Sequence, residues 1–322
     1  VVGQGNAAWA AGLQAAKSGV KTSIILPGGR FNFSTSNRNL ISGIAVELKE
    51  RLQKTPKQDT AAVLKTWIDS TVNLQVVNGD ADLKISRSGG NWFIKLSNGK
   101  TIKARVLINA SHSSVEGVKP VPQAFQPINF ETKQYRTNIA SGDFLPAQQS
   151  KASLLSLPQL LVHDVENYVH LSDLQQSMAA GQAAGAVGAY AAFFKTKTSK
   201  TNLKAVQGEL LNFKQALMPL EDVALTDSNW RAMQVMALMG VFKLEISQGK
   251  LNFYPERPAT FNDVEDALNA FYYKANIWFE DHENAKVDLD QALSLICYVG
   301  NKSVPQVKRE VEKKWKTAYK FK

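Results

Sequence analysis

The sequence has little of what builds disulfides, membrane spans or metal sites. Its single cysteine, Cys297, lies in the apolar run LSLICYV, so an internal disulfide is excluded and a core position is expected. No apolar run reaches the roughly 18 residues that a membrane span requires, so we expect no transmembrane segment. The four histidines show no HExxH-type spacing and no accompanying acid cluster, so no metal site is predicted.

Positive charge is in excess, but it forms no recognisable nucleic-acid module. The formal net charge is +10, from 38 Lys and Arg against 28 Asp and Glu. The basic residues are scattered, apart from residues 195–204 and 308–322, and Arg does not alternate with aromatic residues. We therefore expect a basic, solvated surface and no nucleic-acid partner.

The opening residues, VVGQGNAAWAAG, have small residues at the spacing of a dinucleotide-binding turn. In such a turn Gly3 permits the tight bend and Gly5 lets a diphosphate approach the backbone. Ala8 lets the following helix pack closely on the strand. Glycines in a βα turn also occur for purely structural reasons, so the surrounding pattern decides how specific the motif is.

That surrounding pattern is a strand, a turn, a helix and a second strand. Residues 6–18 are Ala-rich, with a cap at Asn6 and a stop at Gly19, which predicts a helix. KTSIIL, residues 21–26, predicts a strand closed by Pro27. Only two residues precede the turn, fewer than a first strand normally has, so we expect upstream residues and any targeting signal to be missing.

The next segments predict two helices, a β-meander and an irregular region. Residues 37–54 and 58–69 carry apolar stripes at helical spacing. Over residues 73–110, NLQVVNG, DLKISR, NWFIKLS and TIKARVLINA are separated by turn residues, so we expect hairpins that end in the buried strand VLINA. Residues 112–158 contain five prolines and little periodicity, which predicts irregular structure.

Beyond residue 158 the pattern is mostly helical. A helix is predicted over residues 173–194, and the Lys, Ser and Thr residues after it indicate a linker or domain edge. Further helices are predicted over residues 203–217, 228–240, 261–279, 288–298 and 304–319. We therefore expect an α/β domain over residues 1–198 and a mostly helical domain over residues 199–322.

Three segments of the first domain resemble the FAD-dependent oxidoreductases of the two-dinucleotide-binding-domain type. GQGNAAWAAGLQAAKSGVKTSIILPGG is similar to the opening of that family, and VLINAS is similar to its late strand beside the flavin nucleotide. MAAGQAAGAVGAYAAF is similar to its C-terminal helix, whose amino end points at the flavin. The resemblance implies a Rossmann-like FAD/NAD(P)-binding domain with a β-meander, FAD as cofactor, and flavin-dependent oxidoreduction of a small-molecule substrate.

The resemblance also implies which positions contact the cofactor. They are Gly3, Gly5, Asn6, Ala8, Ser111 and Asp173. Asp173 has two interpretations: a contact to the ribityl or phosphate region, or an ordinary N-cap of the helix that follows. The resemblance names no catalytic acid or base.

Departures from the family pattern favour a second hypothesis. The family's acid at the end of the second strand is replaced by Leu26 or Pro27, and losing that ribose contact weakens binding by about 1–3 kcal/mol. His112 stands where the family has Gly and is interpreted as a pocket plug or loop residue, or as a catalytic group. Residues 112–158 are also short for a substrate region. The alternative is a cofactor-free, degenerate flavoprotein-fold module for binding or surface interaction.

Residues 219–268 resemble an S-layer homology module. The matched positions, in order, are Asp222, Val223, Trp230, Gly240, Phe253, Pro255 and Thr260. In physical terms Trp230 opens an apolar helix face, Gly240 ends that helix, and Thr260 caps the next. The resemblance implies a cell-wall glycan partner and an extracytoplasmic location. The alternative is a helical domain that packs on the first half.

Overall fold

The computed structural model describes residues 1–31, 42–79, 83–119, 121–142, 152–282 and 287–317. Its N-terminal part contains a five-stranded sheet with strand order β11-β7-β1-β2-β3, in which every pair is parallel. The strands are β1 (Val2–Gly3), β2 (Thr22–Pro27), β3 (Leu74–Gly79), β7 (Leu107–Ala110) and β11 (Tyr168–His170). The α/β class expected from the sequence is confirmed, including the adjacent first two strands joined by a helix.

Two Ala-rich helices pack tightly together beside this sheet. They are α1 (Asn6–Lys17) and α5 (Met178–Phe193). A Cβ atom added at Gly181 would lie 2.3 Å from the carbonyl oxygen of Ala7, and one at Gly185 would lie 2.4 Å from that of Ala11. Such distances are shorter than any real Cβ contact, so only glycine allows the two backbones to approach this closely.

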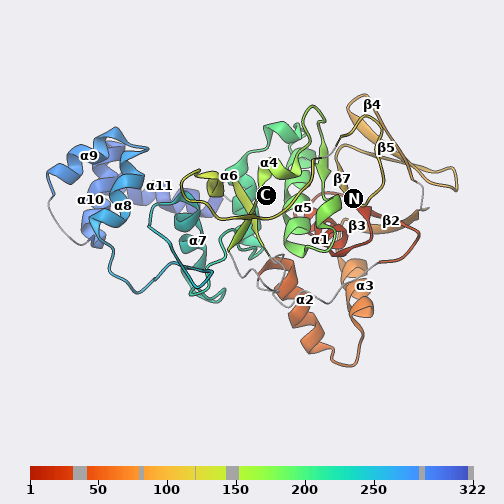
Figure 1. The fold of residues 1–322 in the computed structure, drawn as a ribbon, viewed down its shortest axis with the longest axis horizontal. Coiled ribbons are helices and arrows are strands. Elements are labelled where there is room, and N and C mark those ends of the chain that lie inside the picture. The colour runs from red at the N-terminus through yellow and green to blue at the C-terminus, as the bar shows by residue number, and fades with distance from the viewer. Residues whose placement is uncertain (32–41, 80–82, 120, 143–151, 283–286, 318–322) are drawn as a thin grey trace.

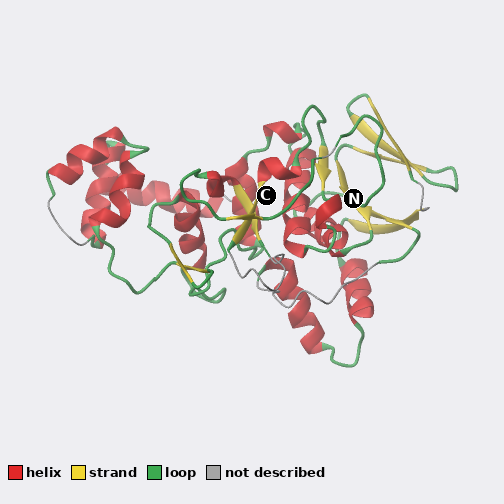
Figure 2. Ribbon diagram, viewed as in Figure 1, coloured by secondary structure: helices red, strands yellow, loops and turns green. Residues whose placement is uncertain are grey.

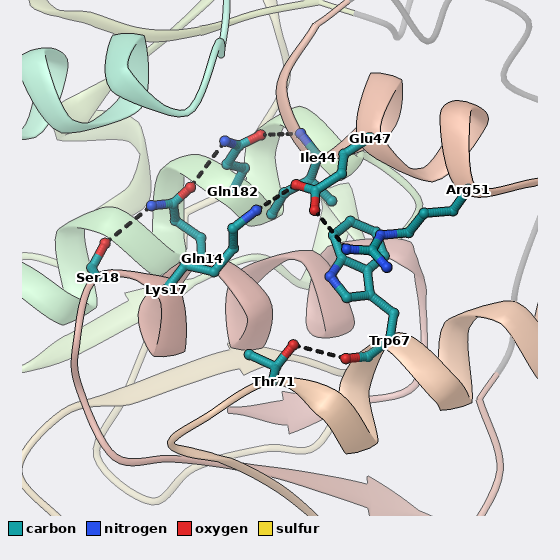
Figure 3. Close-up of polar contacts among 9 residues, drawn as sticks. All are labelled: Gln14, Lys17, Ser18, Ile44, Glu47, Arg51, Trp67, Thr71 and Gln182. Atoms are coloured by element: carbon teal, nitrogen blue, oxygen red, sulfur yellow. Dashed lines mark hydrogen bonds and ion pairs between the residues drawn. The ribbon is translucent and has the colours of Figure 1, made fainter. Parts of the chain in front are cut away.

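Two further helices, α2 (Gly43–Lys54) and α3 (Thr60–Ser70), connect β2 to β3. Figure 3 shows how polar side chains join α2 to α1 and α5. Gln182 donates to Gln14 Oε1 at 2.9 Å and accepts from the N–H of Ile44 at 2.9 Å. Arg51 lies over the ring of Trp67 at 4.4 Å. The expected helices 37–54 and 58–69 are therefore present where the chain is described, although residues 37–41 lie outside the described residues.

A three-stranded antiparallel meander packs on the sheet through its own apolar cluster. It consists of β4 (Lys84–Ser88), β5 (Asn91–Lys95) and β6 (Thr101–Ala104). Its buried Trp92 contacts Tyr168 of β11, with ring centroids 5.5 Å apart. The expected meander is confirmed, but the inclusion of NLQVVNG and VLINA in it is wrong. Those segments form β3 and β7 of the parallel sheet, because tertiary pairing decides which sheet a short apolar strand joins.

The region expected to be irregular contains a second small sheet of order β8-β10-β9. Its elements are β8 (Gln126–Pro127), the 3₁₀ turn η1 (Gln134–Thr137), β9 (Asn138–Ser141), β10 (Ser153–Ser156) and α4 (Leu157–Leu160). Pro127 is tolerated because β8 is an edge strand, where a missing N–H costs little. The prediction of irregular structure is therefore wrong for these residues.

The C-terminal part is mostly helical, and its helices over residues 261–300 lie at the opposite end of the molecule from the meander (Figures 1 and 2). Its elements are η3 (Thr198–Lys200), α6 (Leu203–Asn212), α7 (Trp230–Met239), β12 (Glu245–Ser247), β13 (Lys250–Asn252), α8 (Phe261–Asn269), α9 (Tyr273–Glu280), α10 (Leu289–Gly300) and α11 (Val304–Thr317). The single helix expected over 261–279 is two helices, α8 and α9.

Two apolar clusters divide the core of this C-terminal part. One cluster is continuous from α1 and α5 through α6 and α7 to Leu251. A separate cluster joins Phe261, Trp278 and Leu295 in α8, α9 and α10. The segment after residue 198 therefore starts on the same core as the sheet. Among the described residues no helix is long and apolar enough to span a bilayer.

Candidate functional site

A pocket of about 640 Å³ opens at the carboxyl ends of β1, β2 and β7. Its walls include Gln4 and Gly5 after β1, Pro27 at the end of β2, and Ser111 and His112 after β7. Ligands of open parallel α/β sheets bind at this edge. The structure thus brings together two of the sequence-predicted positions, Gly5 and Ser111, with His112 beside them.

The first bend is shaped mainly by contacts within the protein. Gly3 has φ +149°, and a Cβ there would lie 2.4 Å from the carbonyl oxygen of Ala110, so glycine is needed for β1 to approach β7. A Cβ at Gly5 would lie 2.4 Å from the carbonyl oxygen of Gln175. That same oxygen accepts a hydrogen bond from the N–H of Ala7 at 2.8 Å. The carbonyl group of Gln175 therefore occupies the position that a side chain at residue 5 would take, while Gly5 itself still borders the pocket.

Asn6 and Ala8 are fully buried and do not line the pocket. Asn6 Nδ2 donates to the carbonyl oxygen of Gln176 at 3.2 Å, which joins the start of α1 to the segment before α5. Ala8 belongs to the main apolar cluster, and its N–H donates to the carbonyl oxygen of Gly5 at 3.0 Å. Both positions therefore contribute to packing around the first turn of α1.

The end of β2 offers no carboxylate to a ribose. Its last residue, Pro27, accepts a hydrogen bond from Gln4 Nε2 through its carbonyl oxygen. Among the ten described residues that line the pocket, none is an aspartate or glutamate, and the charged side chain is Lys84. The wall at this point is built from main-chain groups and amides.

Ser111 fixes the turn after β7. Its hydroxyl donates to Asn109 Oδ1 at 2.7 Å and accepts from the N–H of Ser113 at 3.1 Å. Asn109 in turn donates from Nδ2 to the hydroxyl of Tyr168 at 3.0 Å. Because the Ser111 hydroxyl is already engaged in both directions, its main effect is to hold His112 and Ser113 at the pocket wall.

Asp173 lies in the 3₁₀ turn η2 (Ser172–Leu174) and is exposed. Its Oδ2 accepts from the N–H of Gln123 at 2.9 Å. The N-cap of α5 is Ser177, whose side chain accepts from the N–H of Ala180 at 3.1 Å. The N-cap interpretation of Asp173 and the expected helix start at 173 are therefore wrong. Residues 172–177 form a polar turn, so the helix begins only at Met178.

The sequence analysis did not identify a buried row of hydrogen-bonded polar side chains beside the pocket. His170 Nε2 lies 2.7 Å from Ser172 Oγ, and its Nδ1 lies 3.5 Å from the hydroxyl of Tyr168. Burial lowers the pKa of His170, an effect that the carboxylate of Asp173 partly opposes. Burial likewise raises the pKa of Tyr168, against the hydrogen bond from Asn109. The available signal was the spacing Tyr-x-His on one face of a strand, followed two residues later by a serine in the next turn.

Gln182 and its neighbouring glycines act inside the helical layer. The Gln182 amide bonds to Gln14 and Ile44, as Figure 3 shows, and Gly181 and Gly185 admit α1. Gly188 admits Ile108 of β7, since a Cβ there would lie 2.9 Å from Ile108 Cδ1. Contacts within the protein therefore account for the glutamine and glycines of this helix, which the flavoprotein resemblance placed beside the flavin.

The segment resembling an S-layer homology module forms a helix, a hairpin and a second helix. Gly240 ends α7 in a left-handed conformation with φ +66°, and Thr260 with Asp263 forms a capping box at α8. The carboxylate of Asp222 accepts from the N–H groups of Phe253 at 2.9 Å and Tyr254 at 2.6 Å. The roles expected of Gly240 and Thr260 are confirmed as local structure.

Comparison with protein-family models gives no match for this chain, and comparison with curated proteins gives none either. Within the described residues no group of three or more His, Cys, Asp or Glu side chains is arranged to hold a metal ion. The functional argument therefore rests on the pocket and its surroundings.

Proposed function

We propose that this chain is a cofactor-free binding protein built on a flavoprotein-like α/β architecture. The observation that carries the proposal is the 2.8 Å hydrogen bond from the N–H of Ala7 to the carbonyl oxygen of Gln175. A diphosphate at this bend needs free main-chain donors. Here a carbonyl oxygen takes the N–H of Ala7 and lies where a Cβ atom of residue 5 would be. The residues present therefore do not fit an FAD diphosphate at this position.

The pocket itself supports binding of a smaller polar ligand. Its volume of about 640 Å³ falls in the range of small-molecule sites, and its walls present hydroxyl, amide and imidazole groups. His112, Ser113 and Ser114 reach this lining from the segment after β7, and Gln4 and Pro27 reach it from the ends of β1 and β2. A dinucleotide normally forms a hydrogen bond from its ribose to an acidic side chain at the end of β2, and this chain has no acid there. A smaller hydrogen-bonding ligand does not depend on that contact.

FAD-dependent oxidoreduction is the second candidate, and the sheet favours it. β1, β2 and β7 are adjacent and parallel, and the pocket lies at their carboxyl ends. For this function the Gln175 segment has to leave the N–H of Ala7. The flavin would then supply hydride chemistry while Gly5 and Ser111 line its nucleotide site. No described residue is assigned a proton-transfer role in this alternative.

Purified full-length protein separates the two candidates. The cofactor-free proposal expects no flavin absorbance band and a melting temperature that does not change with FAD. A ligand that binds the folded state at about 100 times its Kd stabilises it by about 2.7 kcal/mol, so saturable binding is readily seen. Titrations with AMP and with riboflavin serve as controls for the two halves of the cofactor. A yellow protein, or one that FAD stabilises more than AMP does, overturns the proposal.

A further inference from the structure

The amino ends of the parallel strands form an edge of the sheet opposite the pocket, and basic side chains gather there. α1 and α5 run in the same direction, since the contacts between them advance together along both helices. Both helices therefore end at this edge. A narrow hollow of about 260 Å³ at the edge is lined by Lys21 before β2, Lys103 of β6, Arg105 before β7 and Ala192 of α5.

The chain that follows α5 is held at the same edge by hydrogen bonds. Thr198 Oγ1 accepts from the N–H of Asn167, directly before β11, at 2.9 Å. The hydroxyl of Ser199 donates to the carboxylate of Glu166 at 2.6 Å. Trp92 of the meander donates to the carbonyl oxygen of Asn167 at 2.7 Å, which brings the β4–β5 turn to this edge as well. We name the surface formed by these segments the basic edge, and it comprises residues 17–21, 87–92, 101–106, 163–167 and 193–204.

Positive charge dominates the basic edge when the neighbouring carboxylates are counted too. Its nine basic residues are Lys17, Lys21, Arg87, Lys103, Arg105, Lys195, Lys197, Lys200 and Lys204, and its two acidic residues are Asp164 and Glu166. Glu47 and Glu209 lie at its border, where Glu47 pairs with Lys17 and Glu209 accepts from Ser18, so the balance becomes nine to four. The carboxyl ends of α1 and α5 add about half a negative charge each. An excess of positive charge therefore remains at this edge.

Two phenylalanine side chains stand directly before the lysines of the basic edge. Phe193 is 41% exposed and Phe194 is 48% exposed at the end of α5, and Lys195 follows them. Their ring centroids lie 5.1 Å apart in an edge-to-face arrangement. α5 itself contains no charged residue. Aromatic residues beside lysines are typical of segments that lie in a membrane interface, because the rings enter the headgroup layer while the ammonium groups remain in water.

We propose that the basic edge binds the surface of an anionic phospholipid membrane, with Phe193 and Phe194 entering the headgroup layer. Seven of its nine basic residues are lysines, which attract the diffuse negative charge of a lipid surface. Recognition of nucleic acids relies more on arginine, whose guanidinium group bonds phosphates and bases through two parallel hydrogen bonds. The proposal is independent of what the pocket at the opposite edge of the sheet binds.

Co-sedimentation of full-length protein with lipid vesicles tests the proposal. Vesicles of phosphatidylcholine with about 30% phosphatidylserine are expected to bind the protein, because each lysine near an anionic surface contributes about fivefold in affinity. Vesicles of phosphatidylcholine alone are expected to bind at least about tenfold less tightly. Salt at about 0.5 M is expected to weaken the binding, because it screens the charges. Equal binding to both kinds of vesicle overturns the proposal, as does binding to a single-stranded oligonucleotide without binding to either vesicle.

A pair of charge variants separates the basic edge from the net charge of the protein. Lys195→Glu combined with Lys200→Glu is expected to lower the affinity for anionic vesicles at least about tenfold. Lys308→Glu combined with Arg309→Glu changes the net charge by the same amount on α11, outside the basic edge, and is expected to lower the affinity less than about threefold. All four positions are exposed, so folding is retained. Equal losses in the two variants would mean that net charge alone causes binding and would overturn the proposal.

A pair of phenylalanine variants tests insertion into the headgroup layer. Phe193→Gln is expected to lower the affinity for anionic vesicles about threefold or more. Phe271→Gln is the matched control, since Phe271 is 54% exposed between α8 and α9, outside the basic edge, and the affinity is expected to be unchanged. An unchanged affinity in Phe193→Gln, or an equal loss in both variants, overturns the proposal.

Discussion

The carbonyl oxygen of Gln175 and the N–H of Ala7 are joined by a hydrogen bond of 2.8 Å. The bond connects residues that are far apart in the sequence, at the start of α1 and in the segment that leads into α5. It satisfies one of the main-chain donors that every helix leaves unpaired in its first turn. The same donors attract diphosphates in nucleotide-binding folds, so this contact bears directly on function.

Replacement of Gly5 tests how tightly this bend is closed. In Gly5→Ala the new Cβ would lie 2.4 Å from the carbonyl oxygen of Gln175, a backbone atom that cannot rotate away. We expect the free energy of unfolding to fall by about 1–3 kcal/mol in urea denaturation without any ligand. Gly300→Ala is the control, because its nearest neighbour is a lysine side chain at 3.7 Å and no loss is expected. Equal stabilities of the two variants would show that the bend is open.

The glycines of α5 offer a second test of packing against cofactor binding. In Gly185→Ala the added Cβ would meet the carbonyl oxygen of Ala11 at 2.4 Å, so α1 and α5 must separate. We expect a loss of about 1–3 kcal/mol in stability. If the glycine serves packing alone, thermal denaturation gives the same loss with and without FAD. A loss that appears only with FAD present contradicts this role.

The caps at the start of α5 predict different costs for two substitutions. Ser177→Ala removes the acceptor for the N–H of Ala180 at a buried position, so we expect a loss of about 1 kcal/mol. Asp173→Ala removes a part-buried contact to the N–H of Gln123 from a carboxylate that is itself exposed, so water replaces it in part and the expected cost is smaller. Chemical denaturation of both variants at neutral pH is the measurement. A larger loss for Asp173→Ala would restore this residue as the structural cap.

His170 predicts a dependence of stability on pH. Its folded-state pKa lies below the ordinary value of 6.5 because burial disfavours the charged ring. The unfolded chain therefore binds a proton first as the pH falls. The stabilising contribution of His170 is complete above about pH 7, declines from the unfolded pKa downward, and is lost once the pH has passed the folded pKa.

We expect the free energy of unfolding to fall less steeply between about pH 7.5 and pH 5 in His170→Gln than in the unmodified protein. His163→Gln is the matched control for replacing a histidine, because the His163 side chain is 92% exposed. Urea denaturation at several pH values gives the slopes. Identical slopes for all three proteins would show that His170 does not contribute.

The glycan partner implied by the S-layer resemblance stays a prediction with a direct measurement. Full-length protein is expected to co-sediment with purified peptidoglycan if the segment around residues 219–268 binds it. Asp222→Ala removes the acceptor for the Phe253 and Tyr254 N–H groups at an exposed position, so it is expected to lower stability by no more than about 1 kcal/mol and to weaken retention together with it. A protein that stays in the supernatant contradicts glycan binding.

Local signals predicted several elements because the cause lies within a few residues. Gly240 ends a helix since it adopts φ +66° without strain, and Thr260 begins one by pairing with Asp263. The repeated strand and turn pattern of residues 84–104 gave the meander for the same reason. Those predictions needed no knowledge of distant parts of the chain.

The sequence by itself determined the α/β class, the Ala-rich first helix and the glycine bend, because periodicity and turn chemistry are local properties. Only the tertiary structure decided that β3 and β7 join the parallel sheet and that His170 and Tyr168 share a buried row of polar side chains. It alone brought Gln175 against Ala7, across about half of the chain. The reason is that every residue other than proline has the same main-chain N–H group, so the sequence does not identify its acceptor. The packing of the whole molecule determines which acceptor lies within reach.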